Sequence, residues 1–184
     1  LLFELVINYE DGTCTTVHSD NNWKYDFSPV TFNCIYGGED YDARREQKGW
    51  NQIGFDDSHW RPVVMQEAPK GILRPQMAAP VKVASASVST KRTVDPSAFV
   101  LDMGQNLAGF PEITVRGKRG QKVTLIVAEA LTEEGACNQR QTGRQHYYEY
   151  TLKGEGDETW HPRFSYYGFR YIQVEGAVLK GQKN

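Results

Sequence analysis

The amino-terminal residues alternate between apolar and polar side chains with a period of two, as in a half-buried β-strand. The apolar positions of this run are Leu1, Phe3, Leu5, Ile7 and Tyr9. Asp11-Gly12 follows, and a second short run begins at Cys14. An Asp-Gly pair between two such runs is typical of a tight hairpin turn. The sequence therefore predicts an antiparallel hairpin over residues 1–17.

The pattern becomes irregular after the hairpin. A short run begins at Trp23, and an apolar strand predicted over residues 32–36 ends at Gly37-Gly38. The stretch that follows keeps neither a period of two nor one of 3.6, which predicts an ordered loop with one helical turn near residues 56–59. Prolines at positions 69, 75 and 80 then predict a connector over residues 69–80.

Short runs rich in β-branched and aromatic residues follow the connector. They predict strands over residues 81–88, 99–103, 113–115, 123–128, 147–152, 164–167 and 169–174. No helical pattern lies between them, which predicts an all-β protein of antiparallel β-sandwich or jelly-roll type with two adjacent modules. The core predicted between two facing sheets consists of Leu101, Ile113, Val115, Leu125, Val127, Phe169 and Ile172.

Composition and charge exclude several classes of partner. The 184 residues carry 21 Lys and Arg against 23 Asp and Glu, and the two signs are interleaved. This distribution argues against a nucleic-acid partner, which requires a basic surface. No apolar run approaches the roughly 20 residues of a membrane-spanning helix, so no membrane partner is predicted. Cys14, Cys34 and Cys137 are too few for a disulfide scaffold and favour reduced thiols, with Cys14 and Cys34 as the pair to test.

Several sequence blocks resemble the β-sandwich domains of bacterial α-L-rhamnosidases. The blocks are YGGEDYDAR at 36–44, GFDDSHW at 54–60, LDMGQNLAGF at 101–110, ETWHPRF at 158–164 and YGFRY at 167–171. Met103 stands where the family usually has Phe, and Phe110 where it often has Trp. The resemblance extends over nearly all of residues 1–176. It implies that residues 1–68 are the later half of the N-terminal carbohydrate-binding-like domain, hence an incomplete module, and that residues 81–184 are the concanavalin-like β-sandwich domain.

The resemblance also implies a function. In this family a large helical (α/α)6 barrel releases terminal L-rhamnose, so the chain is expected to be a non-catalytic piece of such a glycosidase, acting as a scaffold and carbohydrate-binding surface. The implied partners are the remaining domains of the parent rhamnosidase, above all the catalytic barrel, and a rhamnose-containing glycan. A free-standing carbohydrate-binding module and a pure domain-interaction module are the alternatives. The resemblance suggests a bacterial source and leaves a periplasmic, secreted or cytoplasmic location open.

Polar and aromatic side chains around Tyr41 are the candidate sugar ligands. Carboxylate and guanidinium groups can satisfy neighbouring sugar hydroxyls, while an aromatic ring covers an apolar sugar face. The predicted carbohydrate-binding residues are Tyr36, Glu39, Asp40, Asp42, Arg44 and Trp50. A strand would place Asp40 and Asp42 on one face with Arg44, so a local salt-bridge network is the alternative. Ca²⁺, which takes 6 to 8 oxygen ligands, is the one cofactor considered, and no other metal site is predicted.

No catalytic residue is predicted. Hydrolysis of a glycoside needs two carboxyl groups that flank the scissile bond, whereas the adjacent Asp56 and Asp57 are better suited to capping turns. A second group of residues is predicted to form a domain interface or a structural motif. It consists of Asp102, Gln105, Asn106, Tyr167 and Arg170. The many tyrosines of the carboxy-terminal third are predicted to contribute to the same kind of interface.

Overall fold

The computed structural model describes residues 2–67, 70–72, 74–86, 90–93, 98–142 and 145–178. It divides into two compact units. Unit 1 comprises residues 1–27 and 47–80, and unit 2 comprises residues 28–46 and 81–184. The division differs from the consecutive modules expected from the sequence, because residues 28–46 pack with the carboxy-terminal part of the chain. None of the helices in the described residues is long and apolar enough to span a membrane.

Unit 1 contains two small antiparallel ladders. Strands β1 (Glu4–Asn8) and β2 (Cys14–His18) form the hairpin that the alternating pattern predicts. At its turn the Asp11 carboxylate accepts the backbone N–H of Thr13 at 2.9 Å, and Gly12 has a φ of 83°. Strand β3 (Lys24–Tyr25) pairs with β6 (Arg61–Pro62). The predicted hairpin is thus confirmed.

The described residues of unit 1 include no buried side chain. Leu5 and Val6, which point to opposite faces of β1, are both exposed, at 45% and 48%. A two-stranded hairpin without a covering layer is marginally stable in water.

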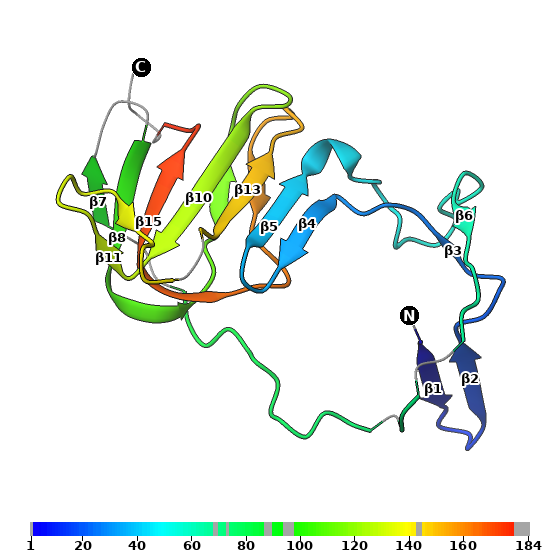
Figure 1. The fold of residues 1–184 in the computed structure, drawn as a ribbon. Helices are drawn as coiled ribbons and strands as arrows, with labels where there is room; N and C mark the ends of the chain where they lie inside the picture. The colour runs from blue at the N-terminus through cyan, green and yellow to red at the C-terminus, as the bar shows by residue number, and fades with distance from the viewer. Residues whose placement is uncertain are drawn as a thin grey trace. The chain divides into compact units, whose positions relative to one another are not determined.

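Unit 2 is built on a seven-stranded sheet (Figure 1). In spatial order its strands are β4 (Val30–Cys34), β5 (Gly38–Asp42), β13 (Tyr147–Thr151), β10 (Lys122–Ala128), β15 (Tyr167–Glu175), β8 (Ala98–Gly109) and β7 (Thr90–Thr93). All neighbours are antiparallel except β5 and β13, which are parallel. Parallel strands need a long connection, and here about a hundred residues separate the two.

Two short ladders accompany the seven-stranded sheet. Strand β9 (Ile113–Val115) pairs with β14 (Glu158–Trp160), and β11 (Ala130–Leu131) pairs with β12 (Cys137–Asn138). Four of the predicted core residues are buried, namely Leu125, Val127, Phe169 and Ile172. The other three, Leu101, Ile113 and Val115, are partly buried against the same core. The all-β prediction is confirmed, since the only helix in the described part is one 3-10 turn, η1 (Ala43–Arg45).

Several predicted boundaries are wrong. The stretch predicted as a loop after Gly37 contains the buried strand β5, whose burial comes from tertiary contacts rather than from an apolar pattern. Residues 56–57 are irregular and residues 58–59 form a simple turn, so no helical turn is present there. Residues 81–86 lie outside any strand, and residues 87–88 of that prediction fall outside the described residues. Residues 164–166 precede β15 without joining it.

Candidate functional site

Glu39 of β5 is a fully buried carboxylate. It accepts the backbone N–H groups of Arg163 and Phe164 at 3.2 Å and the side-chain amide of Asn33 at 3.2 Å. These contacts tie the segment before β15 to β5. In this structure the Glu39 carboxylate is therefore not available to a ligand, although the sequence places it among the sugar-binding candidates.

Asp42 and Arg44 form the local salt bridge considered as the alternative. The Arg44 guanidinium donates through two nitrogens to the two Asp42 oxygens, each at 2.8 Å, and the Arg44 N–H also donates to Asp42 at 3.1 Å. The side-chain hydrogen bonds from Arg44 lower the pKa of Asp42. Asp42 thereby caps η1, so its oxygens are largely occupied.

Asp40 does not join this pair, although a continuous strand would place it on one face with Asp42 and Arg44. The chain turns into η1 directly after Asp42, so Arg44 leaves the strand's face. Asp40 lies opposite Glu149 in the register of β5 and β13. Burial raises the pKa of Asp40, and the charge of Glu149 raises it further. Lys122, which binds Glu149 at 2.7 Å, offsets part of this repulsion.

The two aromatic candidates are exposed. Tyr36, in the turn between β4 and β5, has 77% of its surface accessible, and Trp50 has 59%. Tyr36 belongs to unit 2 and Trp50 to unit 1. The six predicted residues therefore do not all come together within one compact unit.

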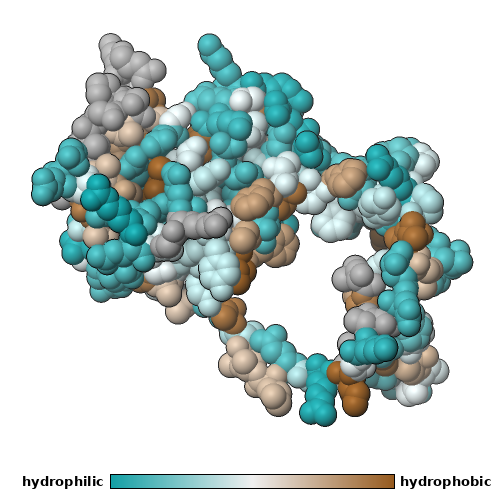
Figure 2. Space-filling model, in the orientation of Figure 1, coloured by the Kyte–Doolittle hydropathy of each residue, from teal (hydrophilic) through white to brown (hydrophobic). Residues whose placement is uncertain are grey.

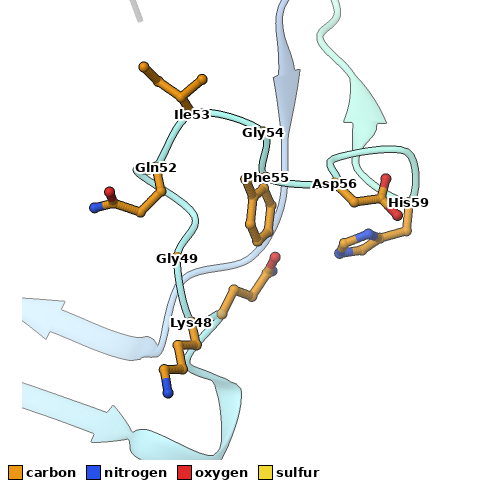
Figure 3. A pocket seen from close by; sticks show the side chains of 9 residues that line it. Lys48, Gly49, Gln52, Ile53, Gly54, Phe55, Asp56 and His59 are labelled. Carbon is orange, nitrogen blue, oxygen red and sulfur yellow. The ribbon is translucent and has the colours of Figure 1, made fainter.

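A different group of residues in unit 1 lines an open hollow of about 570 Å³. Its lining residues are Gln47, Lys48, Gly49, Gln52, Ile53, Gly54, Phe55, Asp56 and His59. Figure 3 shows the Phe55 ring and the His59 imidazole turned toward the same space, while Ile53 points away from it. The two ring centroids lie 6.4 Å apart.

Hydrogen bonds fix the side chain of Gln47, one of the residues that line this hollow. The Trp60 indole N–H donates to Gln47 at 2.8 Å, and the Gln47 amide donates to Asp26. Hydrogen bonds from Ser58 lower the pKa of Asp56, which keeps this rim carboxylate ionised. The sequence pattern did not predict the hollow as a site. Its signal was an aromatic residue between Gly54 and two aspartates, a pattern that is just as typical of a packed turn.

The predicted structural motif of unit 2 centres on an ion pair. Arg170 donates to the two oxygens of Asp102 at 2.8 and 3.0 Å. Asp102 also accepts the N–H of Gly104, which has a φ of 82°. Gln105 and Asn106 follow Gly104 in β8 and are exposed. The structure thus brings Asp102 and Arg170 together and leaves the side chains of Gln105 and Asn106 at the surface.

Tyr167, the fifth residue of that motif, is half-buried. Its ring packs 4.1 Å from that of His146 and 5.7 Å from that of Tyr148. Burial raises the pKa of Tyr167. Among the other tyrosines of this region, Tyr148 and Tyr150 belong to the core, whereas Tyr166 is exposed. Core packing therefore explains some of the tyrosines that were predicted to contribute to an interface.

The cysteines and histidines form no bridge or metal cluster in the described part of the chain. All three cysteines are free thiols, and Cys14 and Cys34 belong to different units. Among the residues that the structure describes, no group of three His, Cys, Asp or Glu is arranged to hold a metal ion.

Comparison with known proteins links this arrangement to one enzyme family. Residues 1–85 match the family described as "Alpha-L-rhamnosidase N-terminal domain". Residues 92–184 match "Bacterial alpha-L-rhamnosidase concanavalin-like domain". The chain belongs to the α-L-rhamnosidase family.

Individual rhamnosidases agree with this assignment in sequence and in structure. An α-L-rhamnosidase of Formosa agariphila is 36% identical over an alignment of 184 positions that covers 96% of this chain and 19% of that protein. The structure of the Dictyoglumus thermophilum α-L-rhamnosidase matches with a TM-score of 0.89 at 34% identity, over 97% of this chain and 21% of that one. The Streptomyces avermitilis enzyme, solved in complex with L-rhamnose, matches with a TM-score of 0.88 at 36% identity, over 99% of this chain and 18% of that one. The chain spans about a fifth of the length of these rhamnosidases.

Glu158, within the part that matches the concanavalin-like domain, is another buried carboxylate of this rhamnosidase segment. It accepts the Tyr150 hydroxyl at 2.9 Å and the backbone N–H groups of residues 153–155 at 2.8 to 3.3 Å. Burial by itself would raise the pKa of Glu158, but the hydrogen bonds outweigh it and the pKa is lowered. Glu158 thus closes the turn between β13 and β14.

The lowered pKa of Glu158 predicts acid sensitivity of unit 2. A carboxylate with a depressed pKa in the folded state contributes stability above its unfolded value of 4.5, and this contribution is lost as the pH falls through the lower folded value. We expect the urea midpoint to fall between pH 5 and pH 3. In Glu158→Gln the protein should be less stable at pH 7 and its midpoint should depend less on pH. If the urea midpoint of Glu158→Gln depends on pH as strongly as that of the wild type, Glu158 is not the source of the acid sensitivity.

Proposed function

We propose that the chain is the non-catalytic β-sandwich region of an α-L-rhamnosidase and acts as a scaffold for a catalytic domain elsewhere in the parent polypeptide. In this proposal residues 1–68 are the later part of the N-terminal domain, residues 69–80 are a connector and residues 81–184 are the concanavalin-like domain. The parent would release terminal L-rhamnose, and its helical barrel would be the main partner of this region.

The observation that carries this proposal is that four carboxylates of unit 2 are bound within the fold. Glu39 and Glu158 accept backbone N–H groups inside the fold, while Asp42 and Asp102 are each held by a bidentate arginine. Hydrolysis of a glycoside needs one carboxyl group free to exchange a proton and a second that faces the anomeric carbon or a water. Carboxylates with these partners stabilise the fold and are poorly placed for either role.

The lining of the hollow supports the same conclusion for unit 1. Asp56 is the one carboxylate among its lining residues. Ser58 hydrogen bonds lower the pKa of Asp56, whereas a general acid needs a raised pKa. A single ionised carboxylate can bind a hydroxyl group but does not supply the acid and base pair of a glycosidase.

The hollow also favours a second function, carbohydrate binding. Phe55 offers an aromatic face, and Gln52 and Asp56 add an amide and a carboxylate group to the same lining. Binding sites for small polar molecules typically combine an apolar surface with a few polar groups. A sugar with one apolar face and a ring of hydroxyl groups fits this chemistry, and the exposed Trp50 is next to the lining residue Gly49 in the chain.

Calorimetry and an activity assay on the purified chain distinguish these functions. We expect no turnover of an aryl α-L-rhamnoside by the chain, and turnover by the parent polypeptide. Titration with millimolar L-rhamnose, with and without Ca²⁺, should give no saturable heat if the chain is only a scaffold. Saturable heat that disappears in Phe55→Ala would support the carbohydrate-binding function.

The matched control is Phe27→Ala, which removes an exposed ring of the same unit that does not line the hollow. Heat lost equally in both variants would mean that the hollow is not the sugar site. Turnover of the rhamnoside by the chain alone would overturn the non-catalytic proposal. An inactive parent polypeptide would overturn the assignment of its activity.

A further inference from the structure

One end of the seven-stranded sheet gathers segments from distant parts of the chain. Strands β4, β10 and β8 run toward this end, while β5, β13 and β15 run away from it. The β4–β5 turn, the segment before β15 and the second half of β8 therefore lie at the same end, the lower end of the sheet in Figure 1.

Large apolar and aromatic side chains are exposed at this end. Ile35 and Tyr36 of the β4–β5 turn have exposed fractions of 64% and 77%, and Phe164 and Tyr166 before β15 have 64% and 55%. The two segments are neighbours because the Phe164 N–H donates to Glu39, the second residue of β5. Figure 2 shows hydrophobic residues over β4 in the same region. Single exposed apolar residues are ordinary, but a gathering of them is typical of an interaction surface.

A polar projection is found at the same end. In the pairing of β8 with β15, Leu107 lies opposite Phe169 and Asp102 lies opposite Tyr171. Residues 103–106 thus form a bulge opposite Arg170 alone. The Arg170–Asp102 ion pair and the positive φ of Gly104 hold this bulge, which presents Gln105 and Asn106 to solvent. Bulges often redirect side chains for a function, and interfaces typically combine an aromatic centre with a polar rim.

We propose that this end of the sheet, which we name the docking end, binds the catalytic domain of the same rhamnosidase polypeptide. Its residues are Ile35, Tyr36, Gln105, Asn106, Phe164 and Tyr166. The inference rests on the proposed function, because it takes its partner from the parent enzyme. In the Formosa agariphila relative the matched segment is 19% of the protein, which leaves about four-fifths of that polypeptide to cover such a surface. Apolar side chains on the partner would pack against the four exposed ones, with the two amides as hydrogen-bonding groups at the rim.

Site-specific photo-crosslinking in the full parent polypeptide tests the proposal. A benzoylphenylalanine replaces Tyr36 in one sample and Glu155, in the turn at the opposite end of the sheet, in a matched control. We expect an intramolecular crosslink from position 36 to a peptide of the catalytic domain, identified by mass spectrometry, and none to that domain from position 155. A crosslink between two copies, or no crosslink from position 36, overturns the proposal.

A second measurement removes the apolar contacts without inserting a probe. The double variant Ile35→Ser with Phe164→Ser should split a single melting transition of the parent into two, because the domains no longer stabilise each other. Val83→Ser, which removes another exposed apolar side chain of unit 2, should melt as the wild type. Identical melting of the double variant and the wild type counts against docking.

The activity of the wild-type parent separates the two proposals. If the parent hydrolyses an aryl rhamnoside but shows no crosslink from position 36, the docking inference fails and the proposed function stands. If the parent is inactive, the proposed function fails whatever the crosslink shows.

Discussion

Replacing Glu39 by alanine is expected to destabilise unit 2 by about 3 kcal/mol, because two backbone N–H groups lose their buried acceptor. Each unsatisfied buried donor costs roughly 1 to 3 kcal/mol, and the substitution also leaves a small cavity. Urea unfolding followed by circular dichroism and by the fluorescence of Trp160, which is part of the core, measures the loss.

Two variants identify the cause of this loss. Glu39→Gln keeps an oxygen acceptor in the same place and should cost clearly less than the alanine variant. Glu133→Ala removes an exposed carboxylate of unit 2 and should change the free energy of unfolding by no more than about 0.5 kcal/mol. Equal losses in Glu39→Ala and Glu133→Ala would show that the buried hydrogen bonds contribute nothing measurable.

Gly38→Ala is expected to have an effect at least as large, by separating β5 from β13. Gly38 has a φ of 100°, and a Cβ atom at this position would lie 1.7 Å from the backbone oxygen of Tyr147. No side-chain adjustment relieves a clash with backbone, so the parallel pairing must open. The loss of ladder hydrogen bonds and of the Glu39 contacts should cost more than roughly 3 kcal/mol.

Gly156→Ala is the matched control for the steric argument. Gly156 has a φ of 86°, and nothing lies within 4 Å of an added Cβ atom. The free energy of unfolding of this variant should fall by only about 1 kcal/mol, which is the cost of placing an alanine in the left-handed region. Hydrogen exchange should show faster exchange of the β5 and β13 amides in Gly38→Ala and not in Gly156→Ala. Similar urea midpoints for Gly38→Ala and Gly156→Ala would show that the predicted clash with the Tyr147 backbone has no effect on stability.

Strands with regular alternation were predictable because their burial follows a period of two. Val123, Leu125 and Val127 alternate with Thr124 and Ile126, and the structure buries the first three in the core. The hairpin over β1 and β2 was likewise predicted by its pattern and its Asp-Gly turn. Both features depend on interactions that are local in sequence, namely the pleat and the turn.

The role of the acidic strand β5 was not predictable from its residues. Its sequence, GEDYD, has the composition of a loop, yet Glu39 and Tyr41 are buried. Glu39 becomes a buried acceptor only because residues 163 and 164, more than a hundred positions away, bring two N–H groups to it. The hollow around Phe55 has a similar origin, since Gln47 and His59 come together only when the intervening turns fold.

The sequence by itself determined the strand-rich class, most of the core and the family resemblance, because period-two patterns and short motifs are local properties of the chain. Only the tertiary structure decided that residues 28–46 join unit 2, which carboxylates are occupied by the fold and which side chains are left exposed at one end of the sheet. The physical reason is that a carboxylate, an aromatic ring or an amide has no fixed role of its own. Its role depends on the donors, acceptors and apolar surfaces that distant segments bring within a few ångströms.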